Sequence, residues 1–347
     1  MGFSFKTAVI LSLCALAGNY LFQVMINIFK RHPIDPTRPL IYYDIVLVLL
    51  PAELGGNNLG VIMSTIFPAS VLYILAIAVL FIATFSTFDK GRHQYNKETA
   101  ILSVEKLVTQ PLLSNSVHIE RNYSDGDFEE NLPAIDYPWF VLSIIFFVFA
   151  CYVALYLGLN KEQKCTWQYD LILTSIYPLL IAELVWGTNY LSSIQKSNPE
   201  TKLKGDLVWN QFSYIPPGLS LVIGFLSGML GIGGGELMGP MLLQWEVLPA
   251  VSVATTSFMS FLNTTSSVLH YLVLNEIPYY YGAVVFGIGC AAGFTGRISA
   301  IYIVRYFDRP SLFMFLLVVV LIISFCIFTY DLVEDSTSYE FQDFCSS

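Results

Sequence analysis

A succession of apolar stretches, each close to the roughly 20 residues that cross a bilayer, dominates this 347-residue chain. The chain is 55% hydrophobic and 12% charged, which is more apolar than the core of a soluble domain of this size needs. The expected spans cover residues 7–29, 41–67, 69–88, 139–158, 171–191, 212–230, 252–274, 280–304 and 311–330. The pattern predicts an all-α polytopic transmembrane helical bundle.

The segment GMLGIGGGELMGP, from Gly228 to Pro240, interrupts this apolar sequence with six glycines, a proline and an acid. Glycine in a helix interior costs about 1 kcal/mol relative to alanine. In a bilayer core each released backbone group would cost several kcal/mol more if it stayed unpaired. We therefore expect a helix break that lines a cavity or binding site. Residues 236–247 are too short to span, so they predict a half-helix and, with it, a glycine-broken discontinuous helix.

An internal repeat relates the two halves of the chain. Residues 12–33 align without a gap over residues 257–278, with a serine at the start and a proline at the end of each. The two segments would cross the membrane in opposite directions, which predicts two inverted repeats. Inverted repeats whose broken helices meet near the midplane are a recurrent plan of secondary transporters.

The predicted organisation has four parts. Residues 1–88 are expected to form the first transmembrane repeat, without a counterpart of the glycine hairpin of the second repeat. Either an N-terminal piece is missing from this sequence, or the protein has only one of two pseudo-symmetric half-sites. Residues 89–137 are polar and mixed in charge, as in a disordered linker. Residues 138–332 are a transmembrane region that contains the second repeat, at about 212–332, and residues 333–347 are an acidic tail.

Charge sets the expected orientation and excludes one class of partner. Lysine and arginine concentrate on the side that holds the linker, which the positive-inside rule makes cytoplasmic. The net charge of −9 argues against a nucleic-acid partner. The sequence predicts an integral multi-pass protein surrounded by lipid, and it leaves open whether the membrane is the plasma membrane or an endomembrane. It also leaves the oligomeric state open.

Two segments resemble a known family. GMLGIGGGELMGPMLL with the polar run SVATTSFMSFLNTTSSVLHYLVL resembles the second-half signature of the sulfite exporter TauE/SafE family. RPLIYYDIVLVLLPAELGGNNLGVIMSTIFP, at residues 38–68, resembles the first-half span of that family. The resemblance implies a transporter of sulfite, organosulfonate or another small sulfur anion. If the protein itself has only one half-site, the alternative is a non-transporting membrane scaffold or regulatory protein that retains the family fold.

The half-helix start is the first candidate substrate site. A helix N-terminus offers free N–H groups and the positive end of the helix dipole, so Gly233, Gly234 and Gly235 are expected to hold a small oxyanion. Glu236 follows them directly. Either Glu236 takes up a proton before the anion binds, which would couple transport to protons, or it only caps the half-helix.

Polar side chains in other spans supply further candidates. Glu53, Asn57 and Asn58 lie among glycines and would line the pore, with Glu53 as a second site of proton coupling, or would join helices through amide contacts. Asn263 and Thr264, in the polar run, would bind sulfonate oxygens or hold helices together.

Arg297 is the one basic residue inside a predicted span. A charge at that depth costs at least about 2.5–3.5 kcal/mol and faces a cavity or a partner. Arg297 would therefore attract the anion, pair with an acid or extend to the nearer surface. The sequence contains no GxSxG, HExxH, P-loop or paired metal motif, so we expect no enzyme activity, no catalytic residue, no metal and no cofactor.

Overall fold

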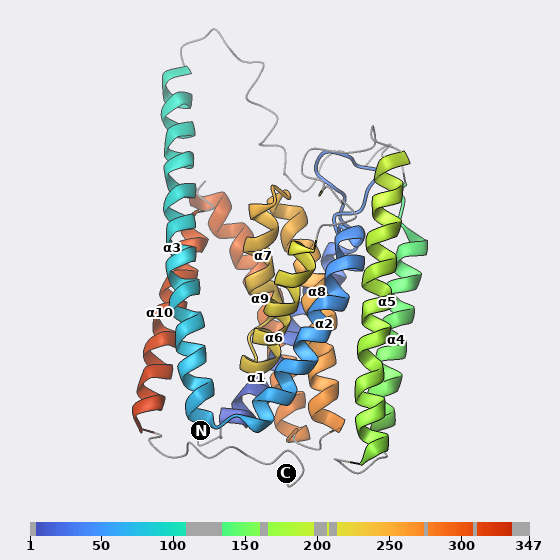
Figure 1. The fold of residues 1–347 in the computed structure, drawn as a ribbon. Helices are drawn as coiled ribbons and strands as arrows, with labels where there is room; N and C mark the ends of the chain where they lie inside the picture. Colours follow the sequence, from blue (N-terminus) through green and yellow to red (C-terminus); the bar gives the residue numbers. More distant parts are fainter. Residues whose placement is uncertain are drawn as a thin grey trace. The chain divides into compact units, whose positions relative to one another are not determined.

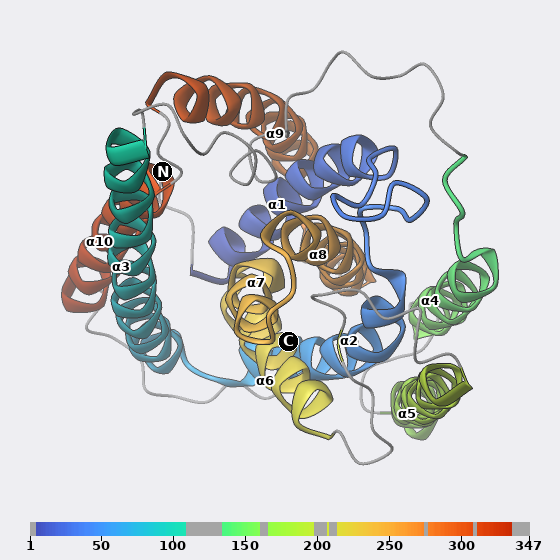
Figure 2. The same cartoon turned by 90° about the horizontal axis from the view of Figure 1, so that it is seen from above.

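The computed structural model describes residues 5–108, 134–159, 166–197, 207, 214–273, 277–307 and 311–334, and its regular structure is helical. Figures 1 and 2 show the helices from two directions. The helices are α1 (Phe5–Asn27), α2 (Tyr43–Ile66), α3 (Ala69–Val108), α4 (Trp139–Leu159), α5 (Trp167–Ser197), α6 (Ile215–Leu230), α7 (Gly234–Gln244), α8 (Pro249–Val273), α9 (Tyr279–Phe307) and α10 (Ser311–Glu334). Within the described residues, 6 helices are long and apolar enough to cross a membrane. The predicted all-α polytopic fold is confirmed.

The helix ends around the glycine segment follow from local sequence. Proline at the start of α6 suits a helix N-terminus, where the missing N–H has no partner to lose. Helix α6 ends at Leu230, and Gly231 follows with φ 68°, a left-handed conformation that glycine adopts at little cost. Helix α7 then begins at Gly234 and is only 11 residues long. Residues 231–233 therefore separate two helices within apolar sequence.

Helix α3 extends further than the hydrophobic pattern predicts. It continues to Val108, so the first 20 residues of the predicted linker, residues 89–108, are helical. That stretch is polar but contains several good helix formers (Lys, Gln, Glu and Ala), which allow a helix to continue beyond the end of an apolar span. The rest of the predicted linker up to residue 133, like the acidic tail from residue 335, lies outside the described residues.

The chain divides into two compact units. The second comprises Tyr73–Pro133 and Thr295–Ser338, and therefore holds most of α3, the end of α9 and α10. In it, α3 and α10 pack antiparallel through aromatic rings. Tyr73 meets Phe328 with centroids 6.0 Å apart, and Phe88 meets Phe315 at 6.2 Å.

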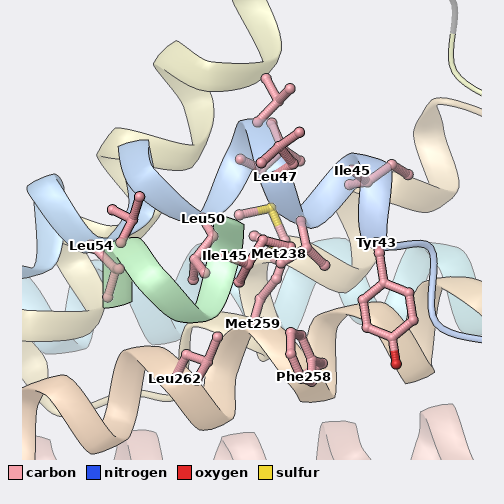
Figure 3. Close-up of a cluster of buried hydrophobic side chains, with 14 of the residues drawn as sticks. Tyr43, Ile45, Leu47, Leu50, Leu54, Ile145, Met238, Phe258, Met259 and Leu262 are labelled. Atoms are coloured by element: carbon pink, nitrogen blue, oxygen red, sulfur yellow. The ribbon is translucent and has the colours of Figure 1, made fainter. Parts of the chain in front are cut away.

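The first unit contains the remaining helices, with α8 at its centre. Helix α8 packs against α1, α2, α4 and α7, as Figure 2 shows for α1, α2 and α7. Leu50 of α2, Ile145 of α4, Met238 of α7, and Met259 and Leu262 of α8 meet in one apolar cluster (Figure 3). All these side chains are buried. This cluster fixes α2, α7 and α8 against one another.

Helices α2 and α6 approach so closely that their backbones touch. A Cβ atom on Gly56 or Gly60 would overlap the carbonyl oxygen of Leu221 or Phe225, respectively. On the facing helix, Gly224 and Gly228 lie in the same way against the carbonyl oxygens of Glu53 and Asn57. Small residues four apart allow such contact between membrane helices. Because both series of contacts rise in residue number together, the two helices run parallel.

Candidate functional site

The start of α7 lies beside an acid in the middle of a membrane span. Oε1 of Glu53 is in contact with Gly234, where a Cβ atom would overlap it. Glu53 lies near the middle of the 24-residue α2 and is completely buried. The N-terminus of α7 is therefore placed near the middle of the span that α2 makes, which is the depth at which the binding sites of many transporters lie.

Hydrogen bonds join Glu53 to α6 and α8. The amide Nδ2 of Asn263 donates to Glu53 Oε1 over 3.1 Å and to Ser227 Oγ over 3.2 Å. One turn further along α8, Ser267 Oγ donates to Asn57 Oδ1 over 2.9 Å. We name the glutamate cluster as Glu53, Asn57, Ser227, Ser260, Asn263 and Ser267, all of which are at most 1% exposed. The cluster brings three helices to the first turn of α7.

Three atoms of the glutamate cluster have no hydrogen-bond partner among the described residues. They are Glu53 Oε2, Ser260 Oγ and Asn263 Oδ1. A buried polar atom without a partner costs about 1–3 kcal/mol, so each requires an explanation. Ser260 Oγ also lies close to Gly235, in the first turn of α7. The unpaired atoms thus gather where a helix start offers its own free N–H groups.

The first turn of α7 has no side-chain cap of its own. Its N-cap residue is Gly233, which carries no side chain that could accept from the N–H groups. A Cβ atom on Gly233 would approach the hydroxyl of Tyr20 in α1, so glycine is also needed there for packing. Free N–H groups, unpaired polar atoms and the absence of bulky side chains together suit a small polar ligand. Among the described residues no group of three or more His, Cys, Asp and Glu side chains could hold a metal ion.

A second polar network lies on the other side of α2. The hydroxyl of Tyr156 in α4 donates to Asn58 Oδ1 and lies 3.3 Å from His270 Nδ1 in α8. The hydroxyl of Tyr152 pairs with Ser266 Oγ at 2.6 Å. We call these five residues the tyrosine network. Asn57 and Asn58 join different networks because consecutive residues of a helix point about 100° apart.

The tyrosine network is expected to stabilise the packing of α4 on α2 and α8. Tyr156→Phe removes a hydroxyl that is buried with its partner Asn58. We expect a loss of about 1–3 kcal/mol of folding stability, because the amide of Asn58 keeps a buried acceptor without its donor. Thermal denaturation in detergent measures the effect. Tyr302→Phe, at a site that is 72% exposed, serves as the control. Equal melting temperatures for the two variants would contradict the role of the network.

The structure brings several predicted site residues together and leaves others apart. Gly233, Gly234, Gly235, Asn263 and Glu53 meet at the start of α7, with Asn57 in the same cluster. Helices α2 and α8, which are distant in sequence, bring Glu53, Asn57 and Asn263 to this place.

For three other predicted residues, the structure gives no side-chain contact with the start of α7. The hydroxyl of Thr264 donates to the carbonyl oxygen of Ser260 in its own helix over 2.7 Å. Arg297 lies in the part of α9 that belongs to the second unit, where it is partly exposed. Glu236 is in the first turn of α7, but its side chain lies outside what the structure describes.

Sequence reasoning missed Ser227, Tyr152 and Tyr156. The first lies between Gly224 and Gly228, and a small-residue repeat on one helix face would have indicated a close helix contact. The two tyrosines are four residues apart in a very apolar helix, so one face of α4 carries both hydroxyls. That spacing was the available signal.

Helices α2, α6 and α8 run parallel, whereas α7 runs antiparallel to α8, because Gly235 meets Ser260 and Gly239 meets Ser252. Helices α6 and α7 therefore form a hairpin and not the single discontinuous helix that the sequence predicts. A bundle of membrane-spanning helices with such a hairpin, whose second helix begins at a buried polar cluster near mid-span, suits a multi-pass membrane transporter. A model of the family described as Sulfite exporter TauE/SafE matches residues 132–327, more than half of the chain. The chain belongs to the sulfite exporter TauE/SafE family.

Curated relatives extend the match over most of the chain. Sulfite exporter TauE/SafE family protein 2 of Arabidopsis thaliana is 28% identical over 94% of this chain and 75% of its own length. Family protein 3 of the same plant is 29% identical over 93% of this chain and 70% of its own length. The probable membrane transporter protein YunE of Bacillus subtilis is 34% identical over 30% of this chain and 37% of its own length. No solved structure matches the chain.

Family membership confirms the broader predictions. The chain is an integral multi-pass membrane protein and a member of a transporter family, not an enzyme. The inverted repeats, the part boundaries and the roles of single residues stay predictions.

Proposed function

We propose that the chain is a secondary transporter of small anions, in particular sulfite, organosulfonate or a related sulfur oxyanion, which it binds at the start of α7. The observation that carries the proposal is the N-terminus of α7, which has no side-chain cap, beside the unpaired hydroxyl of Ser260 and an unpaired oxygen of Glu53 that donates when it is protonated. The names of the relatives, which speak of sulfite export, support the substrate class.

The proposed anion site uses backbone donors and the hydroxyl of one side chain. The N–H groups of the first turn, at Gly234 and Gly235, would donate to the oxyanion, aided by the positive end of the helix dipole. Ser260 has an unpaired hydroxyl beside this turn and would add a donor. Asn263 already donates to Glu53 and Ser227, so it would position Glu53 beside the anion.

The other predicted ligands would act less directly. Asn57, Asn58 and Thr264 are already bonded to neighbouring side chains or to the helix backbone, so they would shape the surroundings of the anion. Arg297 is proposed to attract the anion through its positive charge, with no position relative to the anion site assigned to it.

Glu53 is proposed as the proton-coupling group. An anion and an ionised carboxylate 4 Å apart repel by about 4 kcal/mol at an effective dielectric constant of about 20. That repulsion would weaken anion binding by about a thousandfold. Anion binding next to Glu53 therefore requires that Glu53 first accept a proton, which then travels with the anion. Glu236, which follows Gly235 in sequence, is the second candidate for this role.

Flux measurements on the purified chain test the proposed function. Labelled sulfite and a labelled organosulfonate are offered to sealed proteoliposomes with and without an imposed pH gradient, beside vesicles without protein. We expect protein-dependent flux that responds to the gradient. If folded protein moves neither anion, nor sulfate, the transport proposal fails and the scaffold alternative stands.

A substitution at the start of α7 tests the anion site without disrupting the fold. Gly234→Ala places a methyl group against Glu53 Oε1 and within about 3.1 Å of Asn263 Nδ2, where the flexible glutamate can move but the ligand space is lost. We expect about a 10- to 100-fold fall in flux, equivalent to roughly 1.4–2.7 kcal/mol in the barrier. Initial rates in proteoliposomes give the comparison.

Gly239→Ala is the matched control for Gly234→Ala. Gly239 lies in the same short helix, but a Cβ atom there would meet nothing within 4 Å. Its flux and melting temperature should match the unmodified chain. Equal flux in both variants would argue against an anion site at the start of α7.

A further inference from the structure

An apolar cavity lies on the side of α8 that faces away from the glutamate cluster. It has a volume of about 290 Å³ and is bounded by α1, α8 and the beginning of α9. Phe261, Val268 and Leu269 line it from α8, while Cys14 and Ala17 line it from α1. Its walls are almost entirely apolar. The cavity therefore has no chemistry for binding an anion, and it is distinct from the proposed transport site.

Small residues on the facing helices explain why the cavity exists. On the α9 side its wall includes Gly282 and Ala283, and on the α1 side it includes Ala17. Nearby, α1 and α9 are held at backbone contact, since a Cβ atom on Gly289 would overlap the carbonyl oxygen of Ala15. The helices are therefore fixed close together, yet their side chains do not fill the space beside α8.

The cavity reaches the surface of the helices. Leu272 is 36% exposed and Tyr279 is 61% exposed, and both line its wall. Tyr280 and Tyr281 follow and are exposed as well. Exposed tyrosines at the start of a membrane helix mark the level of the lipid head groups. The open end of the cavity therefore lies near the membrane interface.

The dimensions suit one leaflet of a bilayer. Along α8 the lining runs from Phe261 to Leu272, which is about 16 Å at 1.5 Å per residue. Half of a hydrocarbon core of about 30 Å is close to that length. We propose that this cavity binds an acyl chain of a bilayer lipid, with the head group at the tyrosine-marked end.

The surroundings of the cavity favour an acyl chain over other occupants. The bounding helices α1 and α9 are candidate membrane spans, so the phase that surrounds them consists of acyl chains. A flexible apolar chain gains dispersion contacts with walls that would otherwise face empty space. Helix α8 carries Asn263 of the glutamate cluster on one face and Phe261 of the cavity on another. A bound acyl chain would therefore pack against the face of α8 that is opposite to the glutamate cluster.

Photolabelling with lipid tests this proposal independently of transport. The purified chain is placed in phosphatidylcholine nanodiscs that contain a fraction of phosphatidylcholine with a diazirine in one acyl chain. After illumination, labelled positions are mapped by mass spectrometry. We expect labels on the lining residues between 261 and 272 of α8 and between 279 and 286 of α9. Phe146 and Phe147, on the exposed face of α4, report the labelling by surrounding lipid.

Filling the cavity should remove the label selectively. Ala283→Trp fills the space from α9, whereas Val284→Trp, at the next residue, is 46% exposed and does not line the cavity. Labelling of the α8 lining should fall about tenfold in the first variant and stay unchanged in the second, relative to Phe146. Thr265→Phe fills the cavity from α8 and provides the same comparison if the tryptophan variant does not fold.

Two results would overturn the proposal. One is the absence of label from the α8 lining in the unmodified chain while Phe146 is labelled. The other is equal labelling of that lining in the filled and control variants.

Discussion

Glu53→Gln is expected to abolish the dependence of anion accumulation on a pH gradient while exchange of anion at equal pH continues. Glutamine keeps an oxygen for Asn263 Nδ2 but does not take up or release a proton. With one proton per anion, a gradient of one pH unit is worth about 1.4 kcal/mol and sustains about tenfold accumulation. In the variant the accumulation ratio should fall to about one. Proteoliposomes with a clamped membrane potential and a non-titrating organosulfonate give this ratio directly.

Glu183→Gln is the matched control for that experiment. Glu183 is a second buried acid, located in α5, and one of its oxygens has no partner among the described residues. It receives the same substitution, but it lies in a helix that packs on α2 rather than at the start of α7. Its accumulation ratio should stay near that of the unmodified chain. If Glu53→Gln retained full coupling and Glu236→Gln lost it, the coupling role would pass to Glu236.

Gly224→Val is expected to prevent stable assembly of α2 with α6. The added side chain would overlap the carbonyl oxygen of Glu53 on the facing helix, and neither backbone can yield without separating the helices. We expect a loss of about 3–5 kcal/mol of folding stability, the range of the most damaging single substitutions. The fraction of protein that elutes as a monodisperse peak after heating in detergent measures the effect.

Gly218→Val provides the comparison within the same helix. Gly218 also lies in α6, but a Cβ atom there would meet nothing within 4 Å. The variant should therefore retain the melting behaviour of the unmodified chain. Similar losses in both variants would show that the effect comes from valine in α6 itself and not from the contact with α2.

Much of the fold could be predicted because a membrane restricts the choices. Apolar stretches of about 20 residues have to be helical, since the backbone finds no partner in lipid. The expected span at residues 41–67 corresponds to α2, and the one at residues 139–158 corresponds to α4. Helix α3 extends beyond its apolar part because hydrophobicity indicates where a helix lies in the membrane, and a helix of polar residues can continue outside it.

The candidate site could be predicted only as a set of residues. Glycine next to glycine in apolar sequence indicated a site at residues 233–235, and the intramembrane acid at Glu53 indicated a titratable role. The sequence did not show that these two features meet. Their contact depends on the side of α2 that faces α6 and α8, which the small residues Gly224 and Gly228 decide through backbone packing.

By itself the sequence determined that the chain forms membrane helices, that its apolar run is interrupted by glycines, and to which family it belongs. These properties depend on local composition and residue order. In a bilayer an apolar segment has to pair its backbone groups within a helix, and glycine allows the helix to end there. Only the tertiary structure decided that Glu53, and not Asn58 five residues later in the same helix, lies against the start of α7 with Asn263. A rotation of about 100° per residue separates those two directions, and helix packing alone selects between them.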